Sequence, residues 1–114
     1  MDEKEVDAKI GEVLDELTDL IRETKEYKNY AIQRDKLRQM PDLKRQIDEF
    51  RKENYRMQVM SSPEELFDKA YDFEQRYAAF RDNPIVEDFL AAELALCRLL
   101  QRVNTEITAG VDFE

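Results

Sequence analysis

The chain has 114 residues, of which 39% are charged, and a formal net charge of −9. It contains two glycines, three prolines, one cysteine and no histidine. This length suits one domain with a modest core, and so few glycines and prolines exclude the many tight turns of a β-sandwich or barrel. The lack of histidine excludes a Ser-His-Asp triad, a Cys-His dyad and histidine-ligated zinc. We therefore expect residues 1–114 to form one non-enzymatic domain without a cofactor.

Charge and hydropathy indicate where the protein works. A chain with net negative charge repels nucleic acid and anionic membranes at long range. Its first ten residues lack the apolar segment and the cleavage site of a signal peptide. The apolar segment Phe89–Leu100 is too short to span a bilayer, and Glu93 and Arg98 interrupt it. We expect a cytoplasmic protein that does not insert into a membrane.

Apolar residues recur at helical spacing near the N-terminus. They fall within one arc of about 120° on a helical projection. The spacing predicts a helix over 3–24 whose apolar stripe faces the core, and this stripe comprises Val6, Ile10, Val13, Leu14, Leu17, Leu20 and Ile21.

Two further helices are expected over 26–40 and 41–60, with a kink or break near Pro41. Proline lacks a backbone donor and disfavours the helical conformation in the residue before it. The third helix has a coiled-coil-like series that steps by three and four residues, namely Met40, Leu43, Ile47, Phe50, Asn54 and Met57. Asn54 either fixes register or oligomeric state, or lies at the wetter end of the helix.

The last two helices are marked by Ser62-Pro63 and Asn83-Pro84. In each pair the first residue can cap a helix and the proline suits the first helical position. These signals predict helices over 63–81 and 84–109, and Gly110 supplies a stop. No segment alternates with period two for long enough to predict a strand. The fold expected is all-α: a small antiparallel bundle of four to five helices.

The last helix carries apolar residues on more than one side. Such a helix is usually buried on more than one face, so it is either the central helix or it contacts another subunit. We predict a homodimer or higher homo-oligomer, with candidate interface or core positions at Leu90, Leu94, Cys97 and Leu100. Cys97 is expected to be a buried small hydrophobe, because metal ligation would require cysteines from other chains.

Two glutamates are candidate buried carboxylates. Glu93 lies in the middle of the apolar arc of the last helix, and Glu74 has aromatic residues at neighbouring helical positions. A buried carboxylate needs an arginine, a hydroxyl, a water or a proton. A core or interface ion pair is the first interpretation, and ligand or proton chemistry is the second. A di-iron site is discounted because its Glu-x-x-His motif requires histidine.

Charge is unevenly distributed along the chain. Residues 1–26 carry 4 basic and 10 acidic side chains, a net charge of −6, whereas residues 27–57 carry 9 basic and 5 acidic ones, a net charge of +4. The basic segment is a candidate docking face for RNA or an acidic partner, through Arg34, Arg38, Lys44, Arg45, Arg51, Lys52 and Arg56. The alternative is that these cations pair with the acidic first helix and with their own helical neighbours.

Three segments carry a resemblance to a known family: TKEYKNYAIQRDKL, DLKRQIDEFRKENYRMQ and NPIVEDFLAAELALCRLLQRVNTEI. A tyrosine-bearing helix, a kink, a heptad-like helix and an Asn-Pro entry into an apolar final helix occur in that order. From about Val6 to Gly110, the chain resembles the YlbF/YmcA family of small helical regulators from Gram-positive bacteria.

The resemblance implies a helical bundle without enzymatic activity that acts as an adaptor in hetero-complexes. It implies a part in competence, sporulation and biofilm formation, and in RNA processing by the membrane-anchored endoribonuclease of bacterial mRNA turnover. Protein partners are therefore expected rather than direct RNA contact, and an RNA-associated factor using residues 28–56 is the alternative. Some members are associated with iron–sulfur clusters held by cysteines. Here Cys97 is alone, so any cluster would have to be shared between subunits.

Overall fold

A computed structural model of the chain describes residues 1–113, and in this part it contains five helices and no strand. They are α1 (Glu3–Arg22), α2 (Lys25–Arg38), α3 (Pro41–Met60), α4 (Pro63–Arg81) and α5 (Pro84–Gly110). The predicted all-α class and the break near Pro41 are confirmed. Residue 114, the last of the expected single domain, lies outside the described residues.

Short polar side chains and prolines determine where the later helices begin. The side chains of Ser62 and Asn83 accept hydrogen bonds from the backbone N–H groups of Glu65 and Ile85, at 3.3 and 3.0 Å. A proline follows each cap as the first helical residue, as expected. At the break, Met40 takes a non-helical conformation before Pro41, so α2 ends at Arg38.

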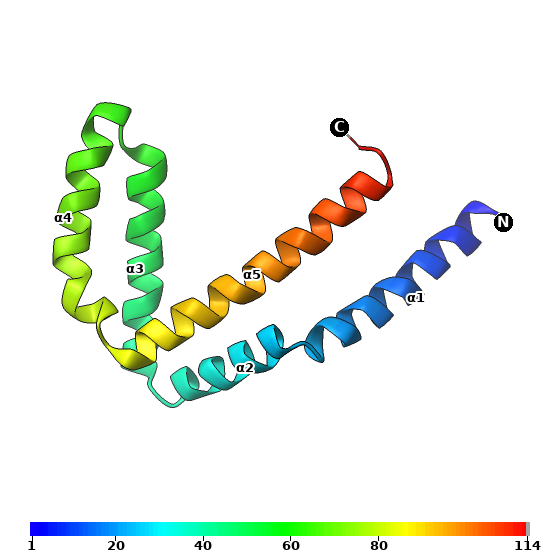
Figure 1. Cartoon of the computed structure of the whole chain (residues 1–114), viewed down its shortest axis with the longest axis horizontal. Helices are drawn as coiled ribbons and strands as arrows, with labels where there is room; N and C mark the ends of the chain where they lie inside the picture. The colour runs from blue at the N-terminus through cyan, green and yellow to red at the C-terminus, as the bar shows by residue number, and fades with distance from the viewer. Residues whose placement is uncertain (114) are drawn as a thin grey trace.

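The helices are arranged as a hairpin joined to two arms. Figure 1 shows α3 and α4 side by side at one end of the molecule, with α2 running antiparallel to the first half of α5. Beyond α2, α1 and the second half of α5 extend away from the hairpin toward the two termini. The molecule is accordingly elongated, with extents of 57 × 38 × 20 Å.

The core lies where α2, α3 and α5 meet. Leu37, Ile47, Val86 and Phe89 form one buried cluster, and Ile47 and Val86 are fully buried. A ring of half-buried side chains packs around this cluster, consisting of Tyr30, Leu43, Phe80, Ile85 and Leu90.

An aromatic cluster extends this core into the hairpin. The ring of Phe50 on α3 lies 5.2 Å from the rings of Phe73 and Tyr77 and 5.4 Å from that of Phe80, measured between centroids. Aromatic pairs at these distances add to the stability that their burial provides. The heptad-like positions Ile47 and Phe50 thus pack inside the chain.

The apolar stripe of α1 does not face this core, so that prediction is wrong. No residue of α1 is buried, and Val13 and Leu20 are 60% and 65% exposed. A turn at Thr24 separates α1 from α2. Its hydroxyl donates to the Ile21 carbonyl at 2.6 Å and accepts from the Tyr27 backbone N–H at 3.2 Å. The same side chain therefore closes α1 and caps α2, and the axis of α1 departs from the core.

Replacing a core isoleucine tests where the stability resides. We expect Ile47→Ala to lower the free energy of unfolding by about 2–4 kcal/mol, because it leaves a cavity at a fully buried site. The matched control Ile32→Ala removes the same atoms at a 55% exposed position, and we expect a change within about 0.5 kcal/mol. Urea denaturation followed by circular dichroism, at one protein concentration, measures both. Equal losses would contradict the position of the core.

The hairpin also predicts an alkaline pH dependence. The Tyr77 hydroxyl donates to Glu53 Oε2 at 2.6 Å, and this bond, with burial, raises the pKa of Tyr77 above its ordinary value of about 10. The neutral tyrosine therefore stabilises the fold below pH ~10, and this contribution is lost as the pH rises through the folded-state pKa.

Tyr77→Phe should accordingly flatten the alkaline decline in stability. Glu53→Gln should bring the pKa of Tyr77 back toward its ordinary value. Tyrosinate absorbance during titration and urea denaturation across the same pH range measure the two effects. As a control, Tyr55→Phe removes an exposed tyrosine and keeps the Tyr77–Glu53 contact. An unchanged alkaline decline in Tyr77→Phe would refute the assignment.

Candidate interaction surfaces

One groove between α3, α4 and α5 gathers most of the predicted interface residues. We call it the three-helix groove, and its volume is about 430 Å³. Five predicted positions line it: Asn54, Glu74, Leu90, Glu93 and Leu94. The remainder of its lining is mixed, consisting of Phe50, Arg51, Met57, Gln58, Ala70, Phe73 and Arg81. The groove is therefore amphipathic, with apolar walls and charges of both signs.

The Glu93 carboxylate, which lies in the apolar arc of α5, forms an ion pair with an arginine. Arg51 of α3 forms an ion pair with it, lies 3.9 Å from Asp48 and places its guanidinium 5.2 Å from the centroid of the Phe89 ring. The Glu93 side chain is 31% exposed, so it is half-buried rather than enclosed. This pair joins α3 to α5 at the edge of the core, where stacking on Phe89 aligns the guanidinium.

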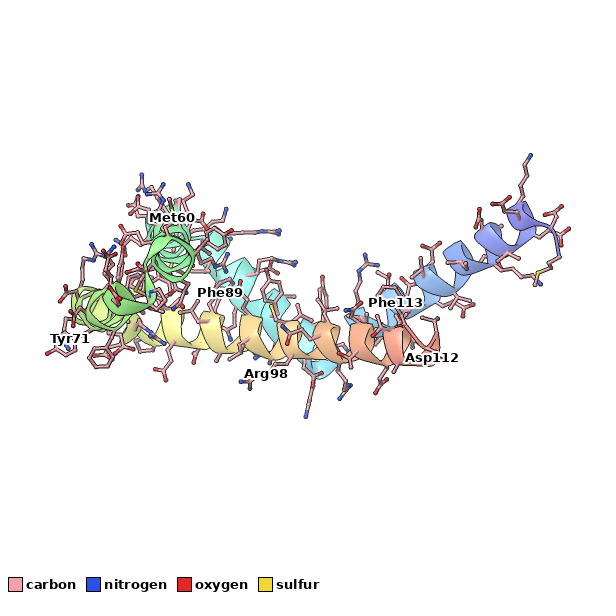
Figure 2. All side chains as sticks on the ribbon, turned by 90° about the horizontal axis from the view of Figure 1, so that it is seen from above. Met60, Tyr71, Phe89, Arg98, Asp112 and Phe113 are labelled. Atoms are coloured by element: carbon pink, nitrogen blue, oxygen red, sulfur yellow. The ribbon has the colours of Figure 1, made fainter. Side chains whose placement is uncertain are left out.

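Glu74 and Asn54, which both line the three-helix groove, are buried to different degrees. Glu74 is exposed, so its predicted burial is wrong. Its neighbour Tyr71 is 61% exposed and points outward from α4 (Figure 2), which shows that this side of α4 has no covering helix. Asn54 is half-buried in the groove wall beside the buried Phe50.

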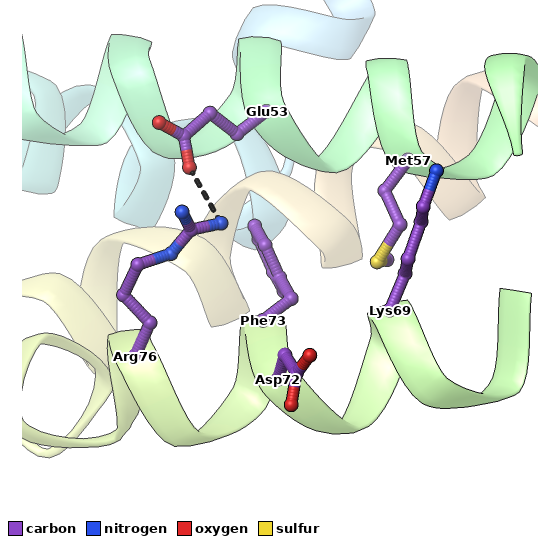
Figure 3. Close-up of a pocket in the computed structure, with 6 residues that line it drawn as sticks. All are labelled: Glu53, Met57, Lys69, Asp72, Phe73 and Arg76. Carbon is purple, nitrogen blue, oxygen red and sulfur yellow. Dashed lines mark ion pairs between the residues drawn. The ribbon is translucent and has the colours of Figure 1, made fainter. Parts of the chain in front are cut away.

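A second pocket within the hairpin contains residues that, apart from Met57, the sequence did not single out. Glu53 and Met57 of α3 face Lys69, Asp72, Phe73 and Arg76 of α4 around a volume of about 340 Å³ (Figure 3). Glu53 accepts from Tyr77 and pairs with Arg76 at 3.1 Å. Helical spacing predicts pairs only within one helix, so a contact across a hairpin leaves no such signal.

The basic segment is divided between two places. Four of its cations line a groove of about 230 Å³ between α2 and α3, namely Arg34, Arg38, Lys44 and Arg51. Arg45, Lys52 and Arg56 are exposed on α3. Most of these cations have carboxylate neighbours: Arg34 and Arg38 pair with Asp35, and Arg45 pairs with Asp42.

Pairing of this segment with the acidic first helix is limited to a single contact within residues 1–113. In the described part of the chain, the one bridge between residues 1–26 and 27–57 joins Lys28 to Glu23 at 3.6 Å, at the end of α1. Within residues 1–113, the carboxylates of α1 itself form no ion pair with the basic segment, so that half of the alternative is limited to the Lys28–Glu23 contact. Lys44, Lys52 and Arg56 form no ion pair within residues 1–113.

An exposed apolar surface lies along α1. We call it the arm surface, and it consists of Val6, Ile10, Val13, Leu14, Leu17 and Leu20 with Ile107 of α5. An apolar groove of about 380 Å³ runs along it. Seen from above, α1 rises away from α5 toward its N-terminus (Figure 2), which leaves this groove open.

The predicted positions on α5 are mostly exposed. Leu94 and Leu100 are 50% and 45% exposed, and Leu90 is half-buried against the core. Cys97 is also exposed, so its predicted burial is wrong: α2 covers a different side of α5, where Phe89 and Ala92 are buried. Among residues 1–113, no three histidine, cysteine or carboxylate side chains gather to hold a metal ion. None of the helices within residues 1–113 has the length and hydropathy of a membrane-spanning segment.

Comparison with known proteins identifies the family. UPF0342 proteins from Caldicellulosiruptor bescii and Caldicellulosiruptor saccharolyticus are each 24% identical to the chain over 101 residues. The alignment covers 87% of this chain and 85% and 84% of the two relatives. No solved structure matches. The family described as control of competence regulator ComK, YlbF/YmcA, matches residues 10–112. The chain therefore belongs to the YlbF/YmcA family.

Proposed function

We propose that this protein is a non-enzymatic, cytoplasmic regulator that acts by assembling with protein partners, the first of which is a second copy of itself. The observation that carries this proposal is the arm surface. Six apolar side chains of α1 lie on one face of a helix that has no buried residue. Contiguous exposed apolar surface of this kind marks protein–protein contact sites.

The energetics favour a covered α1. Fully burying one aliphatic side chain contributes about 1.5–3 kcal/mol, so several on one face offset the cost of association. A helix of 20 residues that packs on little else gains most of its stability from tertiary or quaternary contacts. Self-association therefore orders α1 as well as covering it.

Family membership supports a regulatory role for the assembly. The family name refers to control of a competence regulator. From the resemblance, we propose hetero-complexes that influence competence, sporulation, biofilm formation and RNA processing. The three-helix groove is the surface we assign to such partners, because Arg81 and Glu74 lie there without an ion pair in the described part of the chain.

An RNA-associated factor is the second candidate. The groove between α2 and α3 favours it, since four cations line its walls. Carboxylate neighbours compensate most of these charges, which is why we place this function second.

The self-association is tested by analytical ultracentrifugation. At micromolar concentration we expect the wild type to sediment as a dimer and Val13→Glu to sediment as a 13.6 kDa monomer. A charge buried at this site should weaken association by more than about tenfold. The matched control Ile32→Glu changes a similarly exposed position on α2 and should remain dimeric. A monomeric wild type, or identical behaviour of the two variants, would refute the proposal.

The RNA alternative predicts salt-sensitive binding. If the basic segment holds RNA, the Kd should rise steeply with salt, because neutralised phosphates release counterions. Lys44→Glu/Lys52→Glu/Arg56→Glu, which changes one cation of the groove and two exposed cations of α3, should then weaken binding without breaking any ion pair within residues 1–113. Fluorescence anisotropy with single-stranded RNA measures this. Absence of binding at low salt would eliminate the alternative.

A further inference from the structure

We propose that α1 pairs antiparallel with α1 of a second copy, in the register that places Lys9 opposite Glu16 of the other chain. This proposal rests on the self-association proposed above and specifies its geometry. The occupant of the apolar groove along α1 is thus the same helix of the second copy.

The spacing on α1 is that of a coiled coil. Its central series steps by four, three, four and three residues, from Val6 through Ile10, Val13 and Leu17 to Leu20. Such a series forms a narrow stripe that packs best against another helix of the same kind. Leu14 lies beside this stripe and widens it.

Charge favours the antiparallel orientation. A parallel pair would bring the acidic N-terminal segments together, each of which carries Asp2, Glu3 and Glu5. It would also align two helix dipoles side by side, whereas an antiparallel pair opposes them. In a parallel pair, Lys9 and Glu16 would each face an apolar side chain, so no charge would be compensated.

Charge also selects the register. When Ile10 lies opposite Val13 of the second copy, Val6 lies opposite Leu17, and four apolar layers form. The flanking positions then place Lys9 near Glu16 of the other chain, twice by symmetry. The antiparallel register can be shifted by one heptad so that Val13 lies opposite Leu17 of the second copy. In that register the two copies of Glu16 would face each other. That register also needs Glu23, which already pairs with Lys28.

The structure leaves these groups available. Lys9 lines the apolar groove along α1, and within residues 1–113 neither Lys9 nor Glu16 has an ion-pair partner. From α5, Ile107 alone lines this groove, so the greater part of its length is uncovered.

Distances between spin labels test the register. Three single-cysteine variants, Ala8→Cys, Asp15→Cys and Arg22→Cys, lie on the outer side of the pair, in a Cys97→Ser background that removes the native thiol. At 1.5 Å per residue, the proposed register separates the two labels along the axis by about 10 Å at positions 8 and 15, and by about 31 Å at position 22. Pulsed electron paramagnetic resonance should therefore give equal distances for the first two variants and a longer one for the third.

The other arrangements give different patterns. A parallel pair makes all three distances similar, and the shifted antiparallel register makes position 15 shortest with positions 8 and 22 equal. Either pattern overturns the proposed register and leaves self-association standing. Absence of any intermolecular distance, together with a monomer in the ultracentrifuge, overturns both proposals.

Charge exchange supplies an independent test. Lys9→Glu and Glu16→Lys should each weaken dimerisation by about threefold to tenfold, and the double variant should recover to within about twofold of the wild type. Lys9 and Glu16 are seven residues apart and do not contact each other within one helix, so recovery requires contact between chains. The control Glu12→Lys reverses a charge on the outer side and should change the Kd little. Additive losses in the double variant would refute the contact.

Discussion

The packing of α2, α3 and α5 around Leu37, Ile47 and Phe89 is the contact on which the remaining structure depends. It lies near one end of an elongated molecule, and the hairpin of α3 and α4 is joined to it through Phe50 and the aromatic rings around that residue. Because one small core occupies this end, most of the apolar stripe of α1 lies beyond it and is left uncovered. The arm surface is therefore a consequence of where the core lies.

Much of this fold can be predicted from the sequence, because local signals determine helix ends. Ser62, Asn83 and the prolines act through contacts within a few residues, which spacing reveals directly. The predicted helices over 3–24 and 26–40 end slightly earlier, at Arg22 and Arg38. Thr24 accounts for the first difference, since its hydroxyl serves both helices. Pro41 and the conformation of Met40 account for the second.

The sequence does not predict which helix faces are buried. Periodicity shows which side of a helix is apolar, but it does not show what covers that side. The stripe of α1, Cys97 and Glu74 were each expected inside and are exposed for this reason. Glu93 differs because a charge in an apolar arc must find a partner, and Arg51 is within reach across α3 and α5. The contact of Tyr77 with Glu53 spans a hairpin and has no counterpart in helical spacing.

Because α1 has no buried residue, the needs of the fold and the needs of an interface act on different residues of this chain. In a typical helix, an apolar residue is retained both because the fold needs it and because any interface needs it. On α1 the fold of the chain makes no such demand, since its stripe contributes nothing to the core at Ile47 and Val86. A substitution along this helix can therefore change partner preference while the rest of the molecule keeps its architecture.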